Sequence, residues 1–385
     1  MVKTKFKQIL LVAGESLLIT LITVMSVVPV SCKITEQGVK LLDGDYVPPV
    51  LNDFVVVDES NLRLEFSEKV EVTGYVVSKV TDELFSSEEH SSTLELSPAI
   101  ERASGVYGSV PCSVAADETG CTINVLFEQP MEIGQGYEFY AEVSDIAGNS
   151  LTIAIPFKGF NSHVPELLIT EVQTESISSQ KSAEKTAGTY RNEFVELLVL
   201  KGGNLAGLEL FSAYDGEEKK FVFPTINVST GEVIVVHMRN RGNGCISEEG
   251  DNLAEAFSSY TNSEIRDLWT DIEATTLGNK TDILIIRNTA DNRLIDAVMF
   301  RAGDVTEWAK GLDEYSELAG SSGIYESGSI ENAFITDGMT ASKTMARTDA
   351  AQLQQKALDG EQLTFPIPSG ADVWELISEA TPGAL

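Results

Sequence analysis

The chain has 385 residues, of which 59 are acidic and 27 are basic, giving a formal net charge of −32. So negative a chain repels phosphate backbones and anionic lipid surfaces, which disfavours nucleic acid as a partner. The hydrophobic share of 43% is ordinary for folded protein, so the composition excludes wholesale disorder, and the length predicts about two or three domains.

The first 31 residues are typical of an export signal. Lys3, Lys5 and Lys7 make the start positive, and an apolar stretch free of charges follows from Ser16 to Val30. This stretch is shorter than the roughly 20 residues that span a bilayer, but it suits the apolar core of a signal peptide. We therefore predict a signal peptide over residues 1–31.

The sequence Pro29-Val30-Ser31-Cys32 resembles a bacterial lipobox. The resemblance implies cleavage before Cys32 and lipid attached to its sulfur, hence a protein anchored to a membrane of the cell envelope and facing the periplasm or the cell surface. Pro29 departs from the bulky aliphatic residue that is usual there, and Glu15 interrupts the apolar lead. The alternatives are an ordinary signal peptide and an uncleaved anchor.

Residues 32–52 contain Pro48-Pro49 and scattered charges, and we predict that they form a tether. From there to residue 160, short segments alternate apolar and polar residues with a period of two, the pattern of half-buried strands. These segments are Asn61 to Phe66, Thr122 to Phe127, Tyr137 to Val143 and Leu151 to Phe157. Turn residues separate them, which predicts a β-sandwich over 53–160.

Two segments of this region resemble bacterial Ig-like domains: Leu62 to Val70 (LRLEFSEKV), and Ser144 to Asn149 (SDIAGN), which follows Gly136-Tyr137. Asp145 and Asn149 flank Gly148, so we expect a tight turn capped by side chains. A calcium role for Asp145 would need further oxygen atoms around it, and we expect no metal site and no cofactor.

Cys112 and Cys121 are nine residues apart, and an exported protein can hold a disulfide, so they are a candidate pair that would leave Cys245 unpaired.

A second module begins at Glu166. Its segments Glu166 to Val172, Asn192 to Leu197, Gly203 to Leu210, Phe221 to Pro224 and Ser229 to Val236 are strands or turns on their own terms. Taken in order, with Gly278 to Ile286, Arg293 to Phe300 and the closing Thr381-Pro382-Gly383-Ala384, they resemble the lamin-tail domain. That resemblance covers 164–385 and implies an immunoglobulin-like sandwich. The expected fold is therefore all-β, with two immunoglobulin-like sandwiches in tandem.

Two stretches depart from the lamin-tail pattern. Residues 240–277 form an insertion in which Asn252 to Trp269 has apolar residues at helical spacing, so we predict a helix there. Residues 301–372 form a long excursion, rich in Gly and Ser around 320–329, that we expect to be a loop. Either stretch could form loops that recognise a ligand, or could only extend the packing of the domain.

The chain offers little catalytic chemistry. It contains no GxSxG motif, and His237 lies in a Val-rich segment that predicts a strand residue at the rim of a sheet rather than a catalytic base. Glu171 and Glu196 occupy acidic positions of the lamin-tail pattern, and we expect them to be structural.

We therefore expect an exported, lipid-anchored, non-catalytic protein that binds or scaffolds, with no catalytic residues. The expected partners are the membrane, through the lipid on Cys32, and another envelope or extracellular protein or a glycan. The alternatives are an accessory to a secreted nuclease or phosphatase acting in trans, because the resemblance implies such fusions, and a hydrolase with its site in the insertions.

Overall fold

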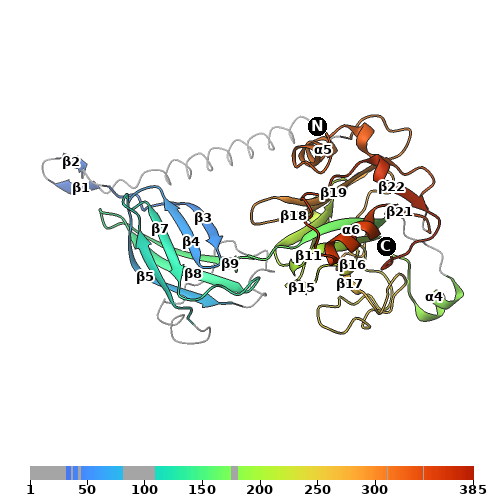
Figure 1. Ribbon diagram of the computed structural model, residues 1–385. Helices are drawn as coiled ribbons and strands as arrows, with labels where there is room; N and C mark the ends of the chain where they lie inside the picture. The colour runs from blue at the N-terminus through green and yellow to red at the C-terminus, as the bar shows by residue number, and fades with distance from the viewer. Residues whose placement is uncertain are drawn as a thin grey trace, which may run out of the picture. The chain divides into compact units, whose positions relative to one another are not determined.

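The computed structural model describes residues 32–35, 38–41, 45–80, 109–174, 181–309, 311–340 and 342–385. The signal peptide predicted over 1–31 lies outside these ranges. The chain divides into two compact units, Met1–Pro130 with Gly136–Phe157, and Met131–Gln135 with Lys158–Leu385 (Figure 1). Within the described ranges, no helix has both the length and the apolar character needed to cross a membrane.

The first unit is a β-sandwich. One sheet has four strands in the order β3-β4-β7-β6, and the other has three in the order β5-β8-β9. This strand order is that of the constant-type immunoglobulin fold. The strands are β3 (Leu51–Asp58), β4 (Asn61–Phe66), β5 (Glu71–Lys79), β6 (Cys112–Ala116), β7 (Thr122–Phe127), β8 (Gly136–Ser144) and β9 (Ser150–Lys158). In the expected tether, β1 (Cys32–Thr35) pairs with β2 (Gly38–Leu41).

The core of the first unit follows from the alternation in its strands. Leu62 and Leu64 of β4 are fully buried, whereas Arg63 between them is exposed. Aromatic rings fill the space between the sheets, with the ring centroids of Tyr137 and Phe157 at 5.5 Å in a stacked pair. The alternation therefore places one face of each strand in the core.

The second unit is a larger sandwich. Its main sheets have six strands in the order β17-β16-β11-β10-β21-β22 and five in the order β14-β13-β18-β19-β20. The strands of the two sheets are β10 (Glu166–Gln173), β11 (Phe194–Lys201), β13 (Leu208–Ser212), β14 (Phe221–Val222), β16 (Val233–His237), β17 (Arg266–Trp269), β18 (Asp282–Asn288), β19 (Leu294–Arg301), β20 (Phe334–Ile335), β21 (Thr344–Arg347) and β22 (Trp374–Ile377). A small pair of strands, β12 (Gly203–Asn204) and β15 (Asn227–Val228), accompanies them.

The two tandem β-sandwiches confirm the predicted fold class. In the second unit, the neighbours β10, β11 and β16 form one sheet and β14, β13, β18 and β19 the other, as the first strands of an immunoglobulin-like sandwich do. The helices within the described part of this unit are α4 (Ser182–Ala187), α5 (Leu312–Ser321) and α6 (Ala350–Leu358), with the short 3₁₀ helices η1 (Glu217–Lys219), η2 (Ile330–Asn332) and η3 (Ala371–Val373).

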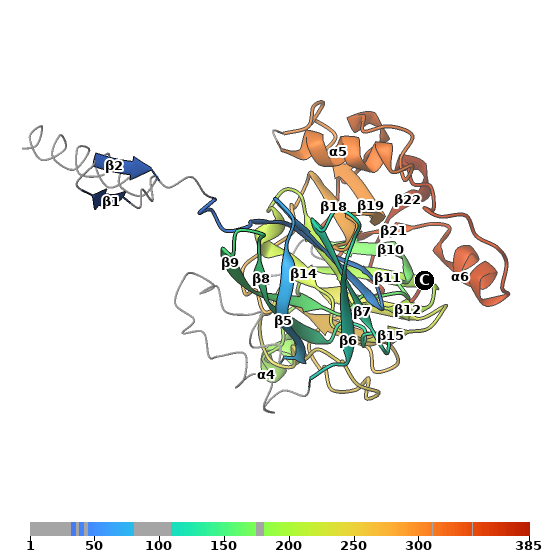
Figure 2. The same ribbon diagram turned by 90° about the vertical axis from the view of Figure 1, so that its left-hand side faces the viewer.

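Strand β11 is buried on both faces, which explains its nearly continuous apolar sequence. Val195 and Leu197 face the main core between the sheets. Leu198 and Leu200 lie on the other face, in a cluster that includes Leu353 of α6. On the opposite sheet, α5 lies beside β18 and β19 (Figures 1 and 2). Helices thus cover part of each outer face.

The helix predicted in the 240–277 insertion is wrong, because residues 252–265 form turns that lead into β17. The backbone N–H groups of Glu255 and Ala256 donate to the buried carboxylate of Glu248, at 3.1 and 3.0 Å. The N–H of Asn262 likewise donates to Asp267, at 3.0 Å. These bonds take donors that a helix would use, and Phe257, which the helical pattern would bury, is 59% exposed.

The excursion over 301–372 is more ordered than the predicted loop. It contains α5 and α6, and it supplies β20 to the five-stranded sheet and β21 to the six-stranded sheet. Strand β21 pairs with β10 on one side and with β22 on the other, so the C-terminal segment joins the sheet through this excursion.

Residues 158–165, where the main segment of the second unit begins, are bonded to β12 and the residues after it. The side chain of Asn161 donates to the carbonyl oxygens of Asn204 and Ala206, at 2.7 and 2.8 Å. The carbonyl of His163 accepts from the backbone N–H of Asn204 at 2.7 Å. This stretch is thus tied to the sheet rather than free in solvent.

Candidate functional site

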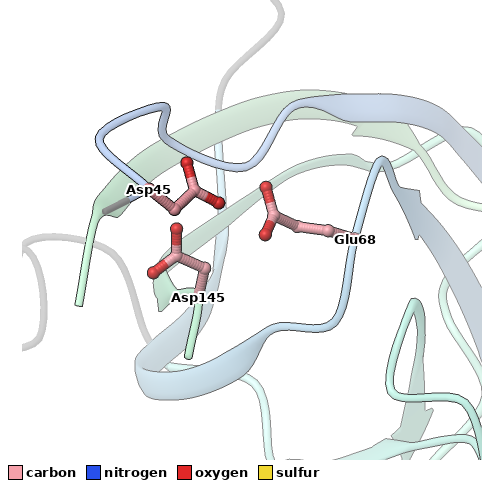
Figure 3. Close-up of side chains that lie close together, drawn as sticks. All are labelled: Asp45, Glu68 and Asp145. Atoms are coloured by element: carbon pink, nitrogen blue, oxygen red, sulfur yellow. The ribbon is translucent and has the colours of Figure 1, made fainter. Parts of the chain in front are cut away.

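Three carboxylates converge in the first unit: Asp45 before β3, Glu68 after β4 and Asp145 after β8 (Figure 3). One carboxylate oxygen from each residue lies within 4.8 Å of those from the other two. The turn that holds Asp145 is the one predicted from its sequence. The backbone and side-chain nitrogens of Asn149 donate to its two carboxylate oxygens, at 2.9 and 2.7 Å, and Gly148 has a φ of 90°.

Asn149 also brings Asp45 to this turn, because its side chain donates to the carbonyl oxygens of Asp45 and Val47. The hydrogen bonds from Asn149 hold the pKa of Asp145 below its ordinary value. The pKa of Glu68 is raised by burial and by the charges of Asp45 and Asp145. Calcium takes about six to eight oxygen ligands, so the three carboxylates would supply only part of its shell.

In the second unit, Glu171 and Glu196 hold the closing turn. The two residues are partners in the register of β10 and β11, and each is 1% exposed. Glu171 accepts from the backbone N–H of Thr381 at 3.1 Å, and Glu196 accepts from that of Gly383 at 2.6 Å. The expected structural role of both glutamates therefore has a geometric basis.

Hydroxyl groups complete the surroundings of these glutamates. Thr344 and Thr381 donate to Glu171, at 2.5 and 3.0 Å, and Thr170 donates to Glu196 at 2.7 Å. Burial raises the pKa of Glu196 to about 7 and also raises that of Glu171. These two glutamates, which already hold the protein's own backbone, line an adjoining cavity of about 540 Å³ together with Glu375 and Glu379.

Further buried carboxylates act in the same way. Glu193 accepts from the backbone N–H groups of Thr276 and Leu277, at 3.0 and 3.2 Å, and burial raises its pKa to about 7. Asp282 accepts from Gly278 at 2.8 Å and from Ser212 at 2.5 Å, and burial raises its pKa to about 6. Each of these side chains fixes a loop to a strand.

His237 is the last residue of β16 and is fully buried. Its Nε2 lies 2.7 Å from a carboxylate oxygen of Asp267, and its ring stacks on Trp269 with the centroids 3.7 Å apart. The expected strand is confirmed, but the expected rim is wrong, because β17 pairs in parallel with β16 and extends the sheet. Phe194 packs edge-on against the same ring.

A second cavity, of about 480 Å³, lies where residues of β14 and β17, strands at the ends of the two sheets, line a common space. We call it the edge cavity. It is lined by Lys220, Phe221, Val222, Pro224, Asn240, Cys245, Ser247, Glu249, Trp269, Thr270, Asp271 and Ile272. Most of the lining thus comes from the 240–277 insertion.

The three cysteines whose side chains are described, Cys112, Cys121 and Cys245, are free thiols. Cys112 pairs with Phe127 in the register of β6 and β7, and Cys121 precedes that residue by six positions. The two are therefore about 20 Å apart along the hairpin, whereas a disulfide needs Cα atoms within about 7 Å. The predicted disulfide is wrong for this register.

Cys32, the predicted lipid attachment site, begins β1, and its side chain lies outside the described part of the chain. Sequence reasoning missed Asp45 and Glu68 as neighbours of Asp145, because their approach depends on three separate loops. It also missed the buried roles of Glu248 and Asp267. In a chain with 59 acidic residues, the sequence alone does not distinguish these buried carboxylates from the many solvated ones.

Residues 165–375 match the family described as "protein second domain" (TP_1001_2nd). A curated relative, an uncharacterized protein of Treponema pallidum (strain Nichols), is 27% identical over 228 residues, which cover 59% of this chain and 54% of that protein. The chain thus spans about half the length of the curated relative that it matches.

Among solved structures, the N-terminal part of the bacterial S-layer protein SbsC is 14% identical, with a TM-score of 0.22 over 67% of this chain and 45% of that chain. Domains 1–6 of the same surface-layer protein give 10% identity and a TM-score of 0.22, over 63% of this chain and 39% of that one. So low a TM-score does not establish a common fold.

Proposed function

The chain belongs to this second-domain family through residues 165–375, and from that premise we propose that it is an exported, lipid-anchored protein of the cell envelope that binds or scaffolds without catalysis. The lipid would be carried by Cys32, after the charged start and apolar stretch of residues 1–31. The two sandwiches would present the protein's binding surfaces outside the membrane.

One observation supports the non-catalytic part of the proposal: three buried glutamates of the second unit accept hydrogen bonds from the protein's own backbone. Glu171 and Glu196 hold the closing turn, and Glu193 holds residues 276–277. A catalytic carboxylate or histidine must instead be within reach of a substrate. The His237 ring stacks on Trp269, packs edge-on against Phe194 and bonds to Asp267, an arrangement that favours a structural role.

The resemblance to a lamin-tail domain remains part of this proposal. The strand order of the second unit is compatible with it, and so is the closing turn of residues 381–384, which lies against Glu171 and Glu196. A rigid sandwich with variable insertions is a common scaffold for recognition, since loops on such a frame can change without loss of the core.

The proposal is tested by labelling cells that express the full chain with a fatty-acid analogue. The wild type should incorporate the label and stay with the membrane fraction, whereas Cys32→Ala should do neither. Cys245→Ala is the matched control, because it removes a cysteine of the second unit and should leave labelling unchanged. Equal labelling of the wild type and Cys32→Ala would overturn the lipid anchor.

A further inference from the structure

The polar groups of the edge cavity differ from the two buried glutamates beside the closing turn. Among the residues that the structure describes, the side chains of Asn240, Glu249 and Asp271 make no hydrogen bond or ion pair within the protein. By contrast, Glu171 and Glu196 of the other cavity are fully engaged with Thr381 and Gly383. The edge cavity therefore presents polar groups that a ligand could use.

The frame of the edge cavity is held in place by its remaining polar groups. The hydroxyl of Ser247 donates to the carbonyl of Trp269 and accepts from its backbone N–H, at 3.2 and 2.8 Å. Thr270 accepts from the backbone N–H of Ile272 at 3.3 Å. The uncommitted side chains thus project from fixed backbone, which lowers the entropic cost of ordering them around a ligand.

Apolar surface lines the same space. Val222 and Pro224 present it from the β14 region, whereas Phe221 and Trp269 lie behind them with only 6% and 5% of their surface exposed. The indole of Trp269 is held by its stack on His237, and Val222 is 61% exposed. The volume of about 480 Å³ lies within the usual range of about 300–1,000 Å³ for small-molecule sites.

Charge and hydrogen-bonding capacity narrow the class of ligand. The carboxylates of Glu249 and Asp271, in a chain of net charge −32, repel an anion. A cation would find acceptors in the two carboxylates. It would also meet the ammonium of Lys220, which is paired at 2.7 Å with Glu209, and it would leave the N–H donors of Asn240 without a partner. A hydroxyl group both donates and accepts, so it can bond to the amide and to the carboxylates.

We propose that the edge cavity binds a neutral saccharide. Its hydroxyl groups bond to Asn240, Glu249 and Asp271, and its C–H faces lie on Val222 and Pro224, the apolar side chains of the lining that reach solvent. This inference deepens the proposed function and rests on it, because it gives the binding protein a glycan as its ligand class.

The test is binding of the full chain, in detergent, to an array of neutral, sialylated, sulfated and amino-sugar oligosaccharides. At least one neutral glycan should be bound, and Asn240→Ala and Asp271→Asn should each weaken that binding by at least about tenfold. Glu379→Gln, which alters the other cavity, is the matched control and should bind as the wild type does.

Two results would overturn the inference: no neutral glycan bound above the level of the Asn240→Ala, Asp271→Asn double variant, or preference for a cationic amino sugar. The circular dichroism spectrum of each variant should match that of the wild type. If Asn240→Ala lost the β-type spectrum, the test would rest on Asp271→Asn alone, because the side chain of Asp271 is exposed. Absent glycan binding with normal labelling at Cys32 would reject the saccharide and leave the lipid anchor in place. Glycan binding without labelling at Cys32 would reject the lipid anchor and leave the saccharide site in place.

Discussion

At the scale of single residues, the second unit uses buried carboxylates where many proteins use water or neutral side chains. Burial raises the pKa of Glu193 and Glu196 to about 7, because removal from water disfavours the charged form. Each of these groups nevertheless accepts hydrogen bonds from backbone N–H groups, which would otherwise be buried without partners. These glutamates hold loops in place, and their contribution to the free energy of unfolding depends on pH.

The stability of the second unit should therefore fall as the pH rises. The pKa of Glu196 is about 7 in the folded protein against 4.5 for an ordinary glutamate, so the unfolded chain ionises first. The stability associated with this group is full below about pH 4.5 and is lost as the pH rises through about 7. Glu196→Gln should reduce the slope between these values by up to about 1.4 kcal/mol per pH unit.

Urea unfolding of the full chain at several pH values measures this slope. Glu379→Gln is the control and should keep the slope of the wild type. An unchanged slope in Glu196→Gln would show that this carboxyl group ionises at the same pH in both states.

Gly383 is a second residue whose role can be tested on its own. It has a φ of 89°, and a Cβ atom there would meet the side chain of Ile265 at 2.5 Å. Gly383→Ala should therefore destabilise the unit by more than the cost of a left-handed backbone alone, about 1–2 kcal/mol. Gly360→Ala is the matched control, because Gly360 has a φ of 73° and open space around it. Equal melting midpoints for the two variants would contradict the close packing of the closing turn.

At the scale of elements, the sequence pattern predicts strands well where one face is solvated. The alternation predicts Asn61 to Phe66 and Thr122 to Phe127 with their observed bounds, β4 and β7. It fails in the 240–277 insertion, since periodic apolar residues do not reveal that Glu248 and Asp267 take the backbone donors. The parallel pairing of β17 with β16 also depends on non-local contacts that no local pattern carries.

The candidate sites likewise divide into one that local sequence determines and one that depends on non-local contacts. The turn around Asp145 could be predicted, because Asp, Gly and Asn determine it locally. The edge cavity could not, because its lining joins β14 to an insertion whose fold is set by buried charges.

Strand β22 is the element whose removal tests how the sandwich closes. Trp374 is 4% exposed and lies in the main core of the second unit. Trp374→Ala should cost about 3–5 kcal/mol, the usual loss for a large aromatic in a core, and should lower the melting midpoint by many degrees. Trp374→Phe keeps most of the buried area and should lie between Trp374→Ala and the wild type. A midpoint unchanged by Trp374→Ala would mean that the C-terminal segment does not contribute to the core.

At the scale of the whole molecule, the two units have separate cores, and we expect them to fold independently. Fragments 45–157 and 158–385 should each give a β-type circular dichroism spectrum and a cooperative melt. The bonds of Asn161 to Asn204 and Ala206 predict that 158–385 melts at a higher temperature than 164–385. Asn161→Ala in the longer fragment should reproduce part of that difference. A cooperative melt in the intact chain alone would contradict two separate cores.

Export of the chain and its anchoring by a lipid on Cys32 can be read from the mass of the N-terminal peptide of the mature protein. The protein should be isolated from the membranes of cells that express the full chain and then digested. The first peptide should begin at Cys32 and carry the added mass of fatty acyl groups. A peptide that continues unmodified through Ser31-Cys32 would contradict it.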